Sequence, residues 1–149
     1  MWTQTALSAV FSDMTEYISR SLEDTERIAA EIAKSLKGTE VIAYTGNLGA
    51  GKTTLTRGIA KAFGVEEGVH SPTFAIVNEY QGRVPIYHFD MYRVTDEDDL
   101  YSTGFYDYLG KGLIIIEWSE NVLDFIPEDA VFIELSYGED ENTRIIKRK

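Results

Sequence analysis

Cysteine is absent from the 149 residues, and positive charge is scarce: 14 Lys and Arg accompany 25 Asp and Glu, for a formal net charge of −11. Without thiols the chain has no disulfide bonds or thiolate metal sites, which is compatible with the reducing cytoplasm where we expect it. No run of 18 apolar residues occurs, so we expect no membrane-spanning helix. The first residues, MWTQTALSAVFSDMTEY, lack a basic segment followed by an apolar one, so we predict no signal peptide there.

The shortage of positive charge limits the kinds of partner. Proteins that bind nucleic acid use Lys and Arg to displace counterions from phosphates, and here the only basic cluster is RIIKRK at residues 144–149. We therefore do not expect this chain to bind RNA or DNA over a broad face by itself. The acidic runs DEDD (Asp96–Asp99) and GEDE (Gly138–Glu141) are interpreted as solvated surface.

The length and the apolar spacing predict one α/β domain. A chain of this size fits a single core, so residues 1–149 are assigned to one domain in which residues 1–13 form a loose extension. Early strand–helix alternation followed by hairpins favours an α/β fold with a mixed parallel and antiparallel sheet flanked by helices. The glycine-rich motif at residues 46–53 makes the expected domain P-loop NTPase-like. We expect Ser21 or Asp24 to cap the first helix and Gly38 to end it. The expected strands are 15–21, 40–45, 71–80, 84–92, 112–118, 129–137 and 142–149, and the expected helical segments are 21–38, 52–64, 96–110 and 120–127.

The clearest motif lies between Val41 and Gly64, where the sequence reads VIAYTGNLGAGKTTLTRGIAKAFG. It fits the pattern G-x-x-x-x-G-K-[ST] after an apolar strand and before a helix, which is the context that the pattern requires. Glycines let backbone N–H groups turn into one concavity, and the following helix adds the positive end of its dipole. An ordinary glycine-rich turn is the alternative interpretation. The residues predicted to hold nucleotide phosphates are Gly46, Asn47, Leu48, Gly49, Ala50, Gly51, Lys52, Thr53 and Thr54.

Each side chain of this loop has an expected role, and the loop needs an acidic companion. Lys52 is expected to reach the β- and γ-phosphates, Thr53 to ligate Mg²⁺ through its hydroxyl, and Thr54 to approach the α-phosphate. A carboxylate that holds Mg²⁺ or its waters usually ends an apolar strand. Glu117 ends LIIIE, and Asp90 ends YHFD. The alternatives are a solvent-facing acid for Glu117, and for Asp90 a cap or a salt bridge with the arginine three residues later.

Other positions near these motifs give less specific signals. His88 is a lone histidine on an expected strand and is interpreted as structural. Trp118 is either a core or interface residue or a neighbour of the nucleotide or a partner. Ser71 and Thr73 lie where switch-type NTPases carry a hydroxyl that senses the γ-phosphate and Mg²⁺. The alternative there is a β-turn in which Pro72 fixes the entry into the next strand.

In this order, the segments TGNLGAGKTTLTRGIAKAFG, SPTFAIVNEY, YHFDMYRV and IIIEWSENV resemble the TsaE (YjeE) family of P-loop ATPases, which act in bacterial synthesis of tRNA threonylcarbamoyladenosine. The resemblance covers residues from about 21 to about 135. It implies ATP and Mg²⁺ as cofactors and an ATPase that is slow alone. It also implies TsaB and TsaD as protein partners, with tRNA contacted only indirectly. We expect the chain to be a monomer until it meets those partners.

The same resemblance implies roles for single residues. Lys52, Asp90 and Glu117 would form the catalytic group, in which Lys52 holds the phosphates and Asp90 assists hydrolysis by orienting water. Thr53 and Glu117 would hold Mg²⁺, and the tryptophan that follows Glu117 would lie beside the metal. Ser119 departs from the proline that many relatives carry after this tryptophan. That departure puts only the local loop geometry in doubt.

Other classes of function also use a P-loop. A small-molecule kinase needs an acceptor pocket and Arg-bearing lid segments that clamp the phosphoryl group, yet residues 95–110 contain no Arg. A non-hydrolysing, nucleotide-dependent regulatory module is disfavoured by the presence of two strand-end carboxylates. A GTPase is disfavoured because the chain contains neither NK nor TK, with which a guanine-reading [NT]-K-x-D motif begins. For adenine, the segment Ser21–Thr25 is the expected wall of the pocket.

Overall fold

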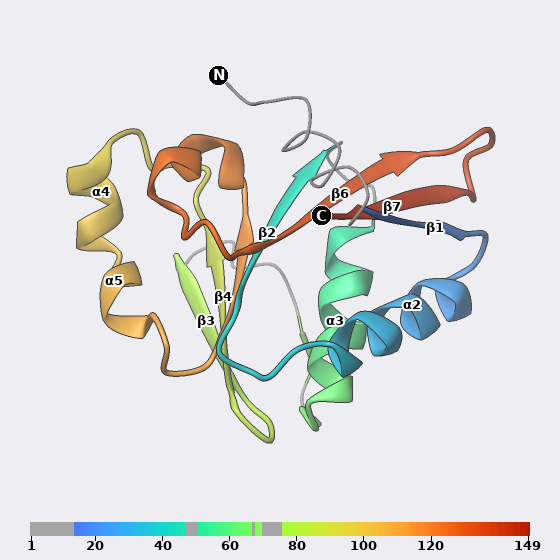
Figure 1. The fold of residues 1–149 in the computed structure, drawn as a ribbon, viewed down its shortest axis with the longest axis horizontal. Coiled ribbons are helices and arrows are strands. Elements are labelled where there is room, and N and C mark those ends of the chain that lie inside the picture. Colours follow the sequence, from blue (N-terminus) through green and yellow to red (C-terminus); the bar gives the residue numbers. More distant parts are fainter. Residues whose placement is uncertain (1–13, 47–50, 67, 70–75) are drawn as a thin grey trace, which may run out of the picture.

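The computed structural model describes residues 14–46, 51–66, 68–69 and 76–149. In this part of the chain, one seven-stranded sheet carries helices on both faces, as Figure 1 shows. The mixed α/β architecture expected from the sequence is therefore confirmed. The expected loose extension, residues 1–13, lies outside the described ranges and stays a prediction. None of the helices in the described ranges is long and apolar enough to cross a membrane.

The sheet has a parallel centre and antiparallel margins. Its strand order is β1-β7-β6-β2-β5-β4-β3. Strands β6, β2, β5 and β4 are parallel to one another, whereas β1, β7 and β6 pair antiparallel at one margin and β3 pairs antiparallel with β4 at the other. The strands are β1 (Thr15–Ser19), β2 (Val41–Gly46), β3 (Val77–Gln81), β4 (Pro85–Asp90), β5 (Leu113–Glu117), β6 (Val131–Tyr137) and β7 (Arg144–Arg148).

Helices cover both faces of the sheet, so the central strands are apolar on both sides, as parallel strands generally are. Ile42 and Tyr44 of β2 contribute to the core under α2 and α3, whereas Val41 and Ala43 contribute to the core under the shorter helices. In Figure 1, α2 and α3 lie on the right of the view, and α4 and α5 lie on the left. The helices are α2 (Leu22–Lys34), α3 (Lys52–Ala62), α4 (Glu97–Ser102), α5 (Phe105–Tyr108) and the 3₁₀ segment η1 (Ser119–Phe125).

Helix α2 begins where the sequence predicted and ends earlier. The Ser21 hydroxyl caps it by accepting a hydrogen bond from the backbone N–H of Asp24 at 3.0 Å. The helix ends at Lys34, because the Ser35 backbone N–H donates to the Ile32 carbonyl and tightens the last turn. The prediction that Gly38 ends this helix is wrong. With φ of +111°, Gly38 instead supplies a left-handed conformation in the loop that leads to β2.

The second hairpin strand is also shorter than expected. Strand β4 ends at Asp90, two residues before the predicted end at residue 92. The Asp90 carboxylate accepts the backbone N–H of Tyr92 at 2.9 Å, which turns the chain out of the sheet. Its partner β3 begins at Val77, and the earlier part of the predicted strand, residues 71–75, lies outside the described ranges.

Candidate nucleotide site

Three neighbouring parallel strands end at one edge of the sheet, and each ends at a residue of the predicted site. Strand β2 leads into the glycine loop at Gly46, β5 ends at Glu117, and β4 ends at Asp90. Glu117 and Asp90 are direct partners in the register of β4 and β5. Helix α3 begins at the same edge with Lys52. The fold therefore brings together the lysine and both carboxylates that the sequence predicted, at the carboxyl edge where open α/β sheets bind ligands.

Glycine occupies both described ends of the glycine loop, and the backbone conformation there explains why. Gly46 has φ of +111°, and a Cβ there would lie 1.9 Å from the Leu135 carbonyl oxygen on β6, so no side chain fits. Gly51 has φ of +99° and precedes α3 without a side-chain cap. Among the described residues no side chain caps α3, and a helix start of this kind suits an external acceptor such as a phosphate oxygen. Between these two positions, Asn47, Leu48, Gly49 and Ala50 lie outside the described residues, and their role stays a prediction.

Lys52 lies under an aromatic side chain. Its side chain is largely buried, with 8% of the residue exposed, and its Nζ lies 5.7 Å from the centre of the Trp118 ring. Trp118 has φ of +61°, the one positive value among described non-glycine residues. Its ring contacts Tyr92 edge-on, with centroids 4.9 Å apart. A left-handed backbone at a bulky residue is strained, and such residues cluster at functional sites. The tryptophan therefore lies next to the lysine that the sequence predicted to bind phosphate, and it also packs, partly buried, against the core under the shorter helices.

Ser119 anchors the turn that carries this tryptophan. Its hydroxyl is buried and donates to the Tyr44 backbone carbonyl at 2.7 Å. Asn121 Nδ2 donates to the Met91 carbonyl at 2.8 Å, which ties the same turn to the segment after β4. Proline has no hydroxyl and cannot make the bond that Ser119 makes. The serine at this position therefore attaches the loop to β2 through a bond that a proline there would lack.

Glu117 is buried beside a histidine that the sequence interpretation set aside. Glu117 is 8% exposed, and its Oε2 lies 3.2 Å from Nε2 of His88, which is fully buried. The two atoms are within ion-pair distance, but neither nitrogen of His88 has a hydrogen-bond partner of acceptable geometry. His88 and Asp90 are two residues apart on β4, so their side chains lie on the same face of the sheet. That spacing is a signal in the sequence that could have placed His88 at the site.

A buried hydroxyl pair lies on the other side of Glu117. The Thr56 hydroxyl of α3 is hydrogen-bonded to the Tyr44 hydroxyl at 3.0 Å and to the Lys52 carbonyl at 2.8 Å. Burial raises the pKa of Tyr44 far above its usual value. The hydrogen bond with Thr56 opposes this increase, and the nearby charge of Glu117 adds to it. Tyr44 therefore stays neutral and ties the first turn of α3 to the sheet beside Glu117.

Asp90 is half-buried and held by its own turn. Its carboxylate accepts the Tyr92 N–H at 2.9 Å, and its backbone N–H donates to the Ile76 carbonyl at 2.9 Å. The described residues contain no ion pair between Asp90 and Arg93, so the salt-bridge alternative is not observed. The capping alternative is observed. It leaves the second carboxylate oxygen available to a water or ligand.

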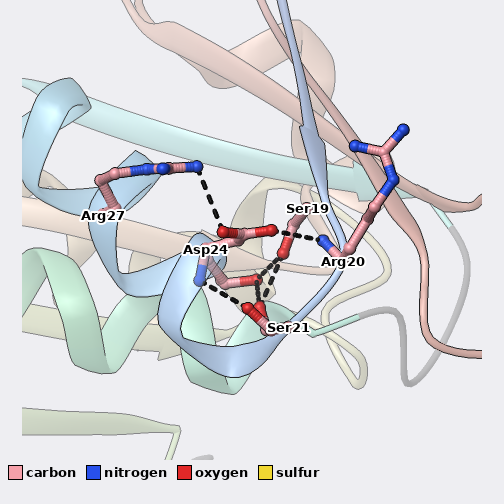
Figure 2. A network of polar contacts seen from close by, with 6 residues as sticks. Ser19, Arg20, Ser21, Asp24 and Arg27 are labelled. Atoms are coloured by element: carbon pink, nitrogen blue, oxygen red, sulfur yellow. Dashed lines mark hydrogen bonds and ion pairs between the residues drawn. The ribbon is translucent and has the colours of Figure 1, made fainter.

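A cleft of about 270 Å³ adjoins the start of α3 on the side of β1. Figure 2 shows the polar network that fixes one wall: the Asp24 carboxylate accepts the Arg20 backbone N–H at 2.9 Å and pairs with Arg27 at 3.2 Å. Ser21–Thr25, the expected adenine wall, contributes to this cleft, whereas no sequence pattern indicated the contribution of the β6–β7 hairpin. The residues that line it are Ser19, Arg20, Ser21, Leu22, Thr25, Gly51, Thr54, Asn142 and Arg144.

The oxygen atoms at this edge suit a hard cation bound together with a nucleotide. Within the described ranges, no three His, Cys, Asp or Glu side chains form a group that could hold a metal by themselves. Mg²⁺ is usually held by one or two protein oxygens and completes its shell with waters and substrate phosphates. The buried carboxylate of Glu117 and the hydroxyl of Thr53 on the first turn of α3 fit that pattern. The switch candidates Ser71 and Thr73 lie outside the described residues and stay predictions.

Comparison with known proteins agrees with this geometry. The family model described as Threonylcarbamoyl adenosine biosynthesis protein TsaE matches residues 19–146. The tRNA threonylcarbamoyladenosine biosynthesis protein TsaE of Treponema pallidum is 36% identical over 129 residues, which is 86% of this chain and 96% of that protein. The protein of the same name from Aquifex aeolicus is 46% identical over 110 residues, which is 72% of this chain and 78% of that protein.

A solved structure supports the same assignment. The crystal structure of Bacillus subtilis YdiB superposes with a TM-score of 0.71 and 29% identity, and the match covers 91% of this chain and 84% of that one. The resemblance drawn from four sequence segments is confirmed over nearly the whole domain. The chain belongs to the TsaE family.

Proposed function

We propose that this protein binds and hydrolyses ATP with Mg²⁺ and acts in the synthesis of tRNA threonylcarbamoyladenosine. The observation that carries the proposal is the meeting, at one sheet edge, of a helix N-terminus that follows a glycine loop, Lys52 and the register-paired carboxylates Asp90 and Glu117. Phosphoryl transfer needs mainly positioning and charge stabilisation, and these groups supply both. The names of the TsaE relatives supply the pathway.

The residues of the site divide the work. The N-terminus of α3 and Lys52 bind the β- and γ-phosphates, and Lys52 reaches them from its position beneath Trp118. Glu117 and Thr53 hold Mg²⁺, which neutralises charge on the phosphates when it is bound. Asp90, with one carboxylate oxygen held by the Tyr92 N–H, orients the attacking water through the other. Burial of Glu117 and Lys52 strengthens these electrostatic contacts because it excludes water.

The cleft between β1, α2 and the β6–β7 hairpin is the proposed seat of the base and ribose. It adjoins Gly51 and Thr54, so a nucleotide whose phosphates bind at the N-terminus of α3 reaches the cleft with its base and ribose, and the protein need not change conformation. Asn142 supplies an amide for the edge of the base, and Arg20 and Arg144 supply planar cations that stack on aromatic rings. The β6–β7 hairpin thus adds nucleotide-binding groups outside the family motifs recognised in the sequence.

TsaB and TsaD are the proposed partners, in the cytoplasm, with tRNA contacted only through them. The net charge of −11 opposes direct binding of nucleic acid and favours a basic protein surface. Isolated P-loop proteins often lack one catalytic group that a partner supplies, which accounts for a slow ATPase in the isolated monomer. We therefore expect the complex to bring the missing element to the edge formed by Lys52, Asp90 and Glu117.

The test is phosphate release from ATP by the purified chain, alone and with TsaB and TsaD. We expect slow release alone, a large increase with both partners, and loss of activity in Lys52→Ala and Glu117→Ala. Lys61→Ala is the matched control, since Lys61 is an exposed lysine at the far end of α3. Equal release with and without the partners would contradict activation. Phosphate transferred to a metabolite would indicate a kinase, and binding of ATP without release would indicate a non-hydrolysing module.

A further inference from the structure

The most unusual buried group in the described part of the chain is His88. It is fully buried on β4, and its two ring nitrogens are the only buried side-chain nitrogen or oxygen atoms there without a hydrogen-bond partner. A buried polar atom is almost always hydrogen-bonded, so an unsatisfied one calls for a functional explanation. The roles proposed above for the nucleotide site do not use this residue.

The surroundings of His88 point to one acceptor. Its Nε2 lies 3.2 Å from Oε2 of Glu117 on the adjacent strand β5. The other groups near Glu117 are engaged elsewhere: the Tyr44 hydroxyl is bonded to Thr56, and the Lys52 ammonium lies over the Trp118 ring. Among the described residues, no hydrogen bond holds the Glu117 carboxylate. A small rotation of that carboxylate would align Oε2 with an N–H on Nε2.

We propose that His88 is a positioning residue that donates a hydrogen bond from Nε2 to Glu117 and thereby fixes the carboxylate for Mg²⁺. The inference rests on the metal-binding role proposed for Glu117. With Oε2 held by His88, Oε1 of Glu117 is the oxygen left for the ion. Carboxylates that bind metals are commonly oriented in this way by a hydrogen bond from a second residue behind them.

The chemistry requires a particular form of the histidine. A neutral imidazole carries one N–H, and it must be on Nε2 for Glu117 to accept it. Glutamine can imitate that arrangement, because its amide nitrogen extends to about the same distance from the backbone as Nε2. Phenylalanine fills the same volume and has no donor. Comparison of His88→Gln with His88→Phe therefore distinguishes the effect of the hydrogen bond from the effect of the ring volume.

The experiment measures ADP affinity by calorimetry with Mg²⁺ and with EDTA, and the quantity of interest is the ratio of the two dissociation constants. We expect His88→Phe to reduce this Mg²⁺-dependent gain roughly tenfold, as loss of such a hydrogen bond commonly does, while ADP affinity in EDTA is unchanged. His88→Gln should keep the gain within about threefold of the unmodified protein. In a Glu117→Gln background, His88→Phe should have no further effect, because the two residues act through one contact.

Ile86→Val provides a structural control. Ile86 is fully buried on the same face of β4, and the change removes one methyl group without touching Glu117. It should lower thermal stability and leave the Mg²⁺-dependent gain intact. If His88→Phe behaves like Ile86→Val, or if His88→Gln loses the gain as fully as His88→Phe, then His88 is only a packing residue and the inference is wrong. Loss of ADP affinity in EDTA would also contradict it.

The same affinity measurements distinguish failure of this inference from failure of the proposed function. If the unmodified protein shows no Mg²⁺-dependent gain, or if Glu117→Gln keeps all of it, then Glu117 does not hold the ion and both proposals fall. If Glu117→Gln removes the gain and His88→Phe does not, only the role of His88 is wrong. The affinity measured in EDTA shows in every case whether the nucleotide site is folded.

Discussion

Residues 90–129 differ sharply from the rest of the chain in charge. They contain eleven acidic and two basic residues, so they carry −9 of the total of −11, whereas the rest is nearly balanced with 14 acidic and 12 basic residues. Nine of the eleven acids are exposed, mainly around α4, η1 and the loops beside them. The exposed apolar side chains Tyr92, Tyr101 and Leu123 belong to the same segment. The glycine loop, α3 and the base cleft come from the balanced part.

The difference separates two physical tasks. A site for a triphosphate cannot tolerate a high density of exposed carboxylates, because they repel the ligand. A surface that selects a basic protein benefits from them. The only two acids of residues 90–129 that are not exposed, Asp90 and Glu117, are those at the strand ends. Each of four substitutions changes a residue in one of these two parts of the chain or in the contact between them.

The largest effect is expected from the balanced part. Lys52→Ala removes the one buried ammonium at the start of α3, so the charge on the β- and γ-phosphates is no longer compensated. We expect the ATPase rate to fall by at least about 100-fold, as removal of a charge-stabilising donor does elsewhere. Partner-activated phosphate release measures it. If Lys52→Ala keeps more than about a tenth of the rate of Lys61→Ala, Lys52 does not belong to the catalytic group.

The acidic segment is altered by the double substitution Glu97→Gln and Asp98→Asn. Both side chains are exposed on the first turn of α4 and neither serves as its cap, which is Asp96. We expect roughly three- to tenfold weaker binding to TsaB and TsaD at low salt, with a smaller effect at high salt. Glu139→Gln with Glu141→Gln, on the β6–β7 hairpin, is the matched control. Equal weakening by both pairs would mean that net charge alone matters.

The contact between the two parts is tested by Ser119→Ala. Ser119 belongs to the acidic segment, and its hydroxyl donates to the Tyr44 carbonyl in β2 of the balanced part. Loss of this buried hydrogen bond should lower the free energy of unfolding by about 0.5–1.5 kcal/mol. Urea denaturation followed by circular dichroism measures it. Because the same turn carries Trp118, a change in tryptophan fluorescence should accompany the loss, and an unchanged spectrum would argue against the anchoring role.

The smallest effect is expected far from both surfaces, at Glu40. Its carboxylate accepts the backbone N–H groups of Lys37, Gly38 and Thr39 at 2.8, 2.8 and 3.1 Å. Partial burial raises its pKa, but these hydrogen bonds together outweigh burial and leave the pKa below its usual value. The folded state therefore binds its proton less readily than the unfolded chain, so the stabilisation exists above the unfolded pKa.

Glu40→Gln should consequently be less stable than the unmodified protein at neutral pH. The difference should shrink as pH falls through the unfolded pKa of the carboxyl toward the lowered folded one. Urea denaturation at several pH values between neutral and about pH 3 measures it. A difference that is constant with pH would show that the hydrogen bonds do not depend on ionisation. Neither ATP hydrolysis nor partner binding should change, because Glu40 lies in the loop between α2 and β2.

Sequence patterns within short segments predicted most of the fold and part of the candidate site. Periodicity and turn residues located the helices and strands, and they failed mainly at ends, as at Gly38, because the helix ends where the Ser35 backbone N–H bonds to the Ile32 carbonyl, a backbone geometry that periodicity does not specify. The glycine loop and Lys52 were predictable because phosphate binding by a loop and a helix start needs only consecutive residues. Asp90 and Glu117 were predictable as strand-end acids, but not as register partners.

Sequence by itself determined that a phosphate-binding loop follows an apolar strand, that two carboxylates end other strands, and that negative charge is concentrated in residues 90–129. Tertiary structure decided which strands are neighbours, and therefore that His88 contacts Glu117 and that Asn142 and Arg144 reach the cleft beside Ser21. The physical reason is that strand order and register depend on contacts between segments far apart in the chain. The alternation of side chains within one strand fixes which face each residue occupies, but not which strand lies beside it.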